Sequence, residues 1–123
     1  MSSHEWNPGE LLEISGCYWK TCALHAGVKL DMFSIIGEKE LTAENVVEKL
    51  NGDIDGIERL LNALTAMELL VKNRGKFQNS DGAKAFLVKR SPAFVGFMIM
   101  HHHHLMESWN WLDDSGIITG IAA

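Results

Sequence analysis

Apolar residues in the first third of the chain recur at mixed steps of three and four, the spacing of a helix that is buried on more than one side. Asn7-Pro8-Gly9 is the first break, and Pro8 suits the first turn of a helix. We therefore predict a helix from Glu10 in which Gly16 allows another backbone to approach and which Gly27 ends. A short apolar helix from Leu30 then stops at Gly37. The apolar positions of the first helix are Leu11, Leu12, Ile14, Tyr18, Trp19, Cys22, Leu24 and Ala26.

The middle of the chain predicts two capped helices and a hairpin. Thr42 can cap a helix that ends at Asn51-Gly52, and Asp53 can cap the next, over 54–70. Residues 69–72 and 76–79, separated by Asn73-Arg74-Gly75, are typical of a β-hairpin. The inward stripe of the second helix is predicted as Ile57, Leu60, Leu61, Leu64 and Met67.

Two further helices are predicted after the hairpin. Ser80 caps a short one that runs through Leu87, and Ser91-Pro92 begins a longer one, followed by an apolar tail over 116–123. Three helices followed by a hairpin are the order of a winged helix-turn-helix. We predict a mainly α, winged helix-turn-helix-like fold with a small β-hairpin and extra N- and C-terminal helices, as one domain over 1–123. The last helix carries one stripe of Phe94, Phe97, Met98, His101, Leu105, Trp109 and Leu112.

Composition excludes several classes of protein. The hydrophobic fraction of 46% and charged fraction of 22% are those of a globular domain, and the net charge of −5 disfavours a nucleic acid as main partner. No apolar run approaches the roughly 18 residues of a membrane span, and the N-terminus shows no secretory signal, so we expect a cytoplasmic protein. Cys17 and Cys22 lie about 140° apart around a helix, which predicts unpaired, buried or half-buried thiols in a reducing compartment.

Several short stretches, taken in order and spacing, resemble one family. The chain from Leu11 to about Leu112 is similar to the N-terminal dimerisation domain of the S-adenosylmethionine-dependent small-molecule O-methyltransferases. The matching stretches are Gly16-Cys17-Tyr18-Trp19, Gly27-Val28-Lys29-Leu30-Asp31-Met32-Phe33, Leu41-Thr42-Ala43-Glu44, Gly56-Ile57-Glu58-Arg59-Leu60-Leu61-Asn62-Ala63-Leu64, Leu69-Leu70-Val71-Lys72 and Ala85-Phe86-Leu87.

The resemblance implies a winged helix that forms a homodimer by intertwining its first and last helices and that closes part of a substrate pocket. In the family, methyl transfer occurs in a following Rossmann-like domain with an acidic-Gly-x-Gly-x-Gly cofactor loop and a histidine base. The chain ends before such a domain could begin, and the glycines within 113–120 lack the loop's spacing. We therefore expect no catalytic, cofactor-binding or metal-binding residue here. S-adenosylmethionine and a small-molecule substrate are expected only in a full-length enzyme.

Aromatic residues on the two terminal helices are candidates for the interface between protomers. Trp19, Trp109 and Trp111 could form a ligand platform, but such residues are more often core or interface anchors. The predicted interface consists of Leu11, Leu12, Tyr18, Trp19, Phe94, Phe97, Met98, His101, Leu105, Trp109 and Leu112.

Four consecutive histidines, His101 to His104, lie within the last predicted helix, and Met100 and Leu105 continue its apolar stripe on either side of them. Only His101 and His104 are spaced to share a metal on one helix face, with Glu107 as the nearest further ligand. The favoured interpretation is one or two buried, hydrogen-bonded histidines at the core or dimer face, with the others solvated. A third interpretation places one histidine beside the substrate pocket of a full-length enzyme.

A winged-helix DNA-binding regulator is the alternative function. The helix over 54–70 would be its recognition helix, yet three of its outward residues are acidic and would repel phosphates. A stand-alone homodimer that binds a small ligand is a third possibility. The outward residues are Asp55, Glu58, Arg59, Asn62 and Glu68, and the basic residues of the wing and its continuation are Lys72, Arg74, Lys76, Lys84, Lys89 and Arg90.

Overall fold

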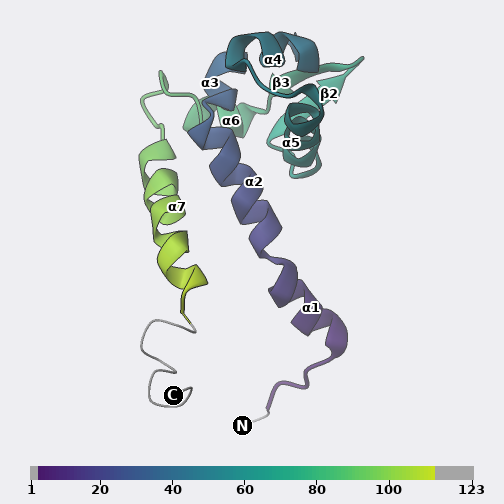
Figure 1. Ribbon diagram of the computed structural model, residues 1–123, viewed down its shortest axis with the longest axis vertical. Coiled ribbons are helices and arrows are strands. Elements are labelled where there is room, and N and C mark those ends of the chain that lie inside the picture. The colour runs from purple at the N-terminus through teal and green to yellow at the C-terminus, as the bar shows by residue number, and fades with distance from the viewer. Residues whose placement is uncertain (1–2, 113–123) are drawn as a thin grey trace.

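Two helices in line, with a third beside them, extend from a cluster of short helices and strands (Figure 1). The structure is a computed structural model that describes residues 3–112. Helices α1 (Pro8–Gly16) and α2 (Tyr18–Lys29) follow one another, and α7 (Gly96–Asn110) lies beside α2. The cluster at the far end of α2 consists of α3 (Met32–Ile36), β1 (Leu41–Thr42), α4 (Ala43–Leu50), α5 (Ile54–Ala66), β2 (Leu70–Asn73), β3 (Lys76–Asn79) and α6 (Asp81–Phe86).

The first predicted helix is two helices, and its glycines have the opposite roles to those expected. The chain breaks at Cys17, whose N–H donates to the carbonyl oxygen of Ile14 at 3.3 Å and so ends α1. Gly16 has no atom of the described residues within 4 Å of where a Cβ would stand. Gly27 lies inside α2, where a Cβ would be 2.9 Å from Phe33. Gly27, not Gly16, is therefore the site of close approach.

The core lies where α2 meets the cluster. Its largest fully buried side chains come from α3, α4, α5, β2 and β3, and the predicted stripe of α5 faces it, with Ile57, Leu61 and Leu64 buried. The predicted caps are also present: Thr42 accepts from Asn45 N, Asp53 from Gly56 N, and Ser80 from Ala83 N, all at 3.0–3.1 Å. The largest fully buried residues are Phe33, Phe77, Met32, Ile36, Leu61, Leu64, Leu70 and Val46.

The predicted hairpin is present, and a third strand joins it. Strand β1 pairs antiparallel with β3, with Leu41 opposite Phe77, to give the order β1-β3-β2. Arg74 and Gly75 connect β2 to β3 with positive φ angles, as a two-residue hairpin turn requires. Helix α5 ends at Ala66 instead of continuing to 70, because the chain reverses through Glu68 at a φ of 65°.

The last helix begins later than predicted. The hydroxyl of Ser91 donates to the carbonyl oxygen of Ala85, and Val95 N–H donates to Phe86 at 2.9 Å. These bonds hold the segment against α6, so Ser91-Pro92 does not start a helix and α7 begins at Gly96. Phe94 consequently precedes the helix on which it was predicted. The apolar tail over 116–123 lies outside the described residues.

Candidate functional site

Large apolar side chains are exposed along both terminal arms of the protomer. Among the residues of α1 none is buried, and Leu12 is 71% exposed. On α7 the side chains of Phe97 and Trp109 are 79% and 67% exposed. We call the following exposed residues the terminal-helix face: Leu11, Leu12, Tyr18, Trp19, Phe97, Met98, Leu105, Trp109 and Leu112.

These are nine of the eleven predicted interface residues, all exposed in the protomer, and their place in an interface stays a prediction. Of the other two, His101 is also exposed, whereas Phe94 is half-buried and stacks edge-on against Phe97 at 5.2 Å between ring centroids. Trp111, the third tryptophan considered, is exposed as well. The expectation that the first helix is buried on more than one side is wrong within one protomer, because α1 lies beyond the cluster that forms the core (Figure 1).

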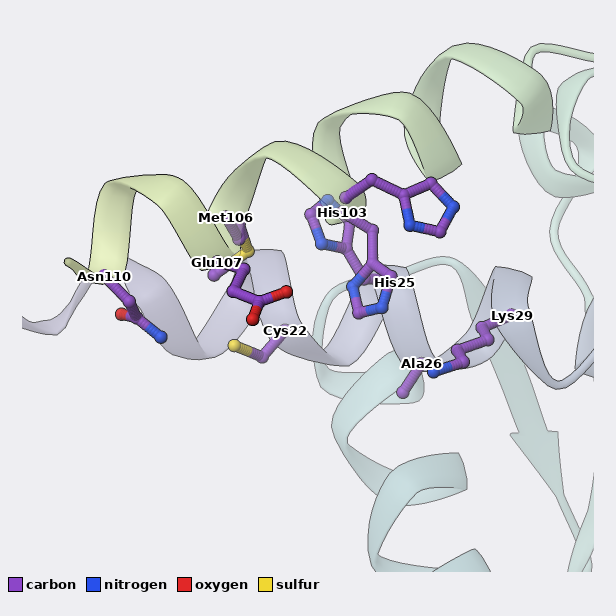
Figure 2. A pocket seen from close by; sticks show the side chains of 9 residues that line it. Cys22, His25, Ala26, Lys29, His103, Met106, Glu107 and Asn110 are labelled. Atoms are coloured by element: carbon purple, nitrogen blue, oxygen red, sulfur yellow. The ribbon is translucent and has the colours of Figure 1, made fainter.

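A groove of about 490 Å³ lies alongside the contact between α2 and α7, lined by residues of both helices (Figure 2). The side chains of Cys22, His25 and Glu107 point into it from the two helices. A second groove of about 310 Å³ shares His25 and Met106 with the first and adds His102 and Trp109. The first groove is lined by Cys22, His25, Ala26, Lys29, His103, His104, Met106, Glu107 and Asn110.

His25 is the buried polar residue of this groove, at 4% exposure. Its ring packs edge-on against that of His103, with centroids 5.3 Å apart and an angle of 82° between the planes. Its Nδ1 atom has no hydrogen-bond partner among the described residues. Burial lowers the pKa of His25 below its usual range, and the neighbouring imidazoles of His103 and His102 lower it further. An uncharged imidazole is therefore favoured at this position.

Within one protomer no histidine of the run is buried in the core, and burial at a dimer face stays a prediction. His103 is half-buried and His101, His102 and His104 are exposed, so the buried one is His25 on α2. His25 precedes the buried Val28 by three residues, so both lie on the same face of the helix, and this spacing could have identified His25 as the buried histidine. Within residues 3–112 no three His, Cys, Asp or Glu side chains are grouped closely enough to hold a metal ion.

The two cysteines are unpaired, as predicted, but both are exposed instead of buried. Cys17 lies at the break between α1 and α2, and Cys22 lines the groove. Their exposure has the same origin as that of the apolar side chains on α1. The N-terminal half of α2 lies beyond the core cluster (Figure 1).

The charged surface around the hairpin is partly paired. Lys89 lies 2.8 Å from Asp31, and Lys72 donates to the amide oxygen of Asn62 at 3.1 Å. Lys84 is 3.6 Å from Glu38. The residues predicted to point outward beside the hairpin, Asp55, Glu58, Arg59, Asn62 and Glu68, are all exposed.

No helix among residues 3–112 has both the length and the apolar character needed to cross a bilayer.

Comparisons with known proteins identify the family. The family model described as the O-methyltransferase dimerisation domain matches residues 12–89. The chain is 33% identical over 92 residues to the N,N-dimethyltransferase OxyT of Streptomyces rimosus, covering 75% of this chain and 27% of that protein. It is 30% identical over 95 residues to the tetracenomycin polyketide synthesis 8-O-methyl transferase TcmO of Streptomyces glaucescens, covering 76% and 28%. The chain thus spans little more than a quarter of these relatives.

Solved structures share the fold. An O-methyltransferase family protein from Burkholderia thailandensis superposes with a TM-score of 0.82 at 23% identity, over 89% of this chain and 33% of that one. Human N-acetylserotonin methyltransferase, solved with SAM, gives a TM-score of 0.79 at 22% identity, over 93% and 35%. The resemblance seen in the sequence is confirmed, since the family model covers more than half of the chain. This chain belongs to the O-methyltransferase dimerisation domain family.

Proposed function

We propose that two copies of this chain pair through the terminal-helix face and form the dimerisation module of an O-methyltransferase. The exposure of this face is the observation that carries the proposal. Its nine members are large apolar side chains that are each at least 42% exposed, and large exposed apolar patches on soluble proteins mark interaction sites. Trp19 and Trp109 are the aromatic anchors that interfaces favour.

The shape of the protomer supports this mode of pairing. Helices α1 and α2 project from the core cluster, and α7 runs beside α2 (Figure 1). A second copy with the same arms could bury both, and a stable interface needs only about 800 Å² from each partner. The apolar side chains of α1 lie outside the core of their own protomer. Intertwining of α1 and α2 with the same helices of a second copy would bury them.

The rest of the domain fits a winged helix in a larger enzyme. Helices α3, α4 and α5 followed by the hairpin have the order of that fold, with β1 as the third strand of its sheet. The module would close part of the substrate pocket. Methyl transfer and S-adenosylmethionine binding belong, in this proposal, to regions outside residues 1–123.

Sedimentation velocity across the micromolar range tests the proposal. The wild-type chain should sediment as a dimer, and a compact monomer throughout that range would contradict it. Leu12→Glu on α1 and Phe97→Glu on α7 each place a charge in the proposed interface and should give monomers with unchanged helical content. Val71→Glu is the matched control, because Val71 is also exposed but lies on β2, away from the face. It should leave the dimer intact.

A further inference from the structure

Helix α7 depends on α2 for its place in the protomer. Among the described elements its extensive contacts are with α2, supplemented by Ile99 and Met100 against the edge of the core. His25 and His103 meet at the middle of this contact (Figure 2). We call the ring contact of His25 with His103, together with the His102 imidazole that lines the same groove as His25, the histidine seam. Any force that acts between these rings acts directly on the position of α7.

The surroundings of His25 in the histidine seam favour an uncharged imidazole. His25 is buried and its Nδ1 has no acceptor among the described residues, so a proton there would add an uncompensated charge. On the other side of α2, two residues along from His25, the apolar side chains of Phe33 on α3 and Leu64 on α5 pack against Gly27. The titratable and charged groups that face the grooves beside His25 are Cys22 and Lys29 on α2 and His102, His103, His104 and Glu107 on α7. Glu107 is the one acid among them.

We propose that the histidine seam is a pH-sensitive contact that releases α7 from α2 when the pH falls below neutrality. While His25 is uncharged, its ring packs edge-on against that of His103. Protonation of His25 places a positive charge in this buried contact, in a groove that Lys29 also lines. Separation of the helices hydrates the charge on His25 and so favours the released state.

The pKa of His25 gives the sign of the effect. Burial, and then His103 and His102, lower this pKa in the folded protomer. The released state therefore binds more protons than the packed state at mildly acidic pH. Packing of α7 is fully stabilised above pH 6.5 and weakens as the pH falls from there toward the lowered pKa. Because α7 carries part of the terminal-helix face, acid would also weaken the proposed dimer, a consequence that rests on the proposed function.

Hydrogen exchange of the α7 amides tests the release, with rates corrected for the intrinsic pH dependence of exchange. A released His25 with the ordinary histidine pKa is half-protonated at pH 6.5, so uptake of one proton lowers the protection of α7 by at most about fivefold from pH 6.5 to 5.5. The amides of α5 provide the internal reference and should not change. His25→Gln removes the titrating group and should flatten the response, whereas His4→Gln, on the exposed N-terminal segment, should retain it. Protection that is independent of pH would overturn the proposal.

Two further measurements do not depend on whether the variants fold, and they separate release of α7 from loss of the dimer. The ring resonance of His25 in the wild-type chain should titrate with a midpoint below 6.5, and a midpoint at or above 6.5 would overturn the seam. Sedimentation at the same pH values separates the two proposals. Acid release of α7 in a chain that is already monomeric at pH 6.5 supports the seam and contradicts the dimer, whereas a dimer with unchanged α7 protection at both pH values does the reverse.

Discussion

Gly27 lies directly against the ring of Phe33, so close that a Cβ on Gly27 would stand 2.9 Å from Cε2 of that ring. The methyl group of Leu64 would be 3.1 Å away on the neighbouring helix. Phe33 and Leu64 are both fully buried and cannot move aside into solvent. The contact joins α2, α3 and α5 at one point.

Gly27→Ala should therefore destabilise the domain although alanine is the better helix former. Overpacking costs about 1–3 kcal/mol, and the gain in helix propensity offsets up to about 1 kcal/mol. We expect the free energy of unfolding, measured with urea, to fall by about 1 kcal/mol. Gly82→Ala in α6 is the control, because no described atom lies within 4 Å of that position. Equal effects of the two changes would contradict the packing account.

Asn79 should be a second sensitive position. Its Nδ2 donates to the carbonyl oxygens of Phe33 and Gly37, at 2.9 Å each, and the residue is 3% exposed. Asn79→Ala leaves two carbonyls without this donor, and we expect a loss of about 1–3 kcal/mol of stability. The matched change Asn62→Ala removes an exposed hydrogen bond to Lys72 and should cost less than about 0.5 kcal/mol. Thermal or urea unfolding of the pair measures the difference.

Trp109→Ala should separate association from folding. The ring is 67% exposed in the protomer, so its removal should leave the helical circular dichroism of a dilute sample unchanged. If Trp109 anchors the interface, its loss costs about 2 kcal/mol or more of binding energy, roughly a thirtyfold rise in the dimer dissociation constant. Val71→Ala on β2 should change neither quantity. An unchanged dissociation constant for Trp109→Ala would exclude the ring from the interface.

The alternative of a DNA-binding regulator makes the opposite prediction for the hairpin. A regulator would lose salt-sensitive binding when Lys72, Arg74 and Lys76 are replaced with alanine. We expect no retained band for the wild-type chain in a gel-shift titration against mixed duplex DNA at about 100 mM salt. The triple variant should dimerise as the wild type does. A shifted band that disappears in the triple variant would favour the regulator.

Local signals explain what could be predicted from the sequence. Thr42, Asp53 and Ser80 cap their helices through residues three positions away, and Arg74-Gly75 supplies the turn that β2 and β3 need. Each of these features depends on neighbours in the chain, so its pattern is visible without the fold.

Features that depend on distant residues were missed. The two-residue strand β1 exists because Leu41 pairs with Phe77, far along the chain, and two residues carry no strand pattern of their own. Ser91 resembles a helix cap, but its hydroxyl donates to Ala85 once α6 is in place. His25 could be recognised as the central histidine only after α7 lay beside α2.

The order of the strands also decides how this protein avoids uncontrolled assembly. Strand β3 is the central strand, which leaves the two-residue strand β1 and strand β2 at the two edges of the sheet, where backbone groups can template the addition of a foreign strand. Strand β2 is only four residues long and has the charged side chain of Lys72 within it, two features that discourage such growth. A protein with so much exposed apolar surface needs this protection against fibrils and amorphous aggregates. Because both edges of the sheet are short, pairing of strands between molecules is disfavoured. Two copies of the chain are then expected to associate through their helices.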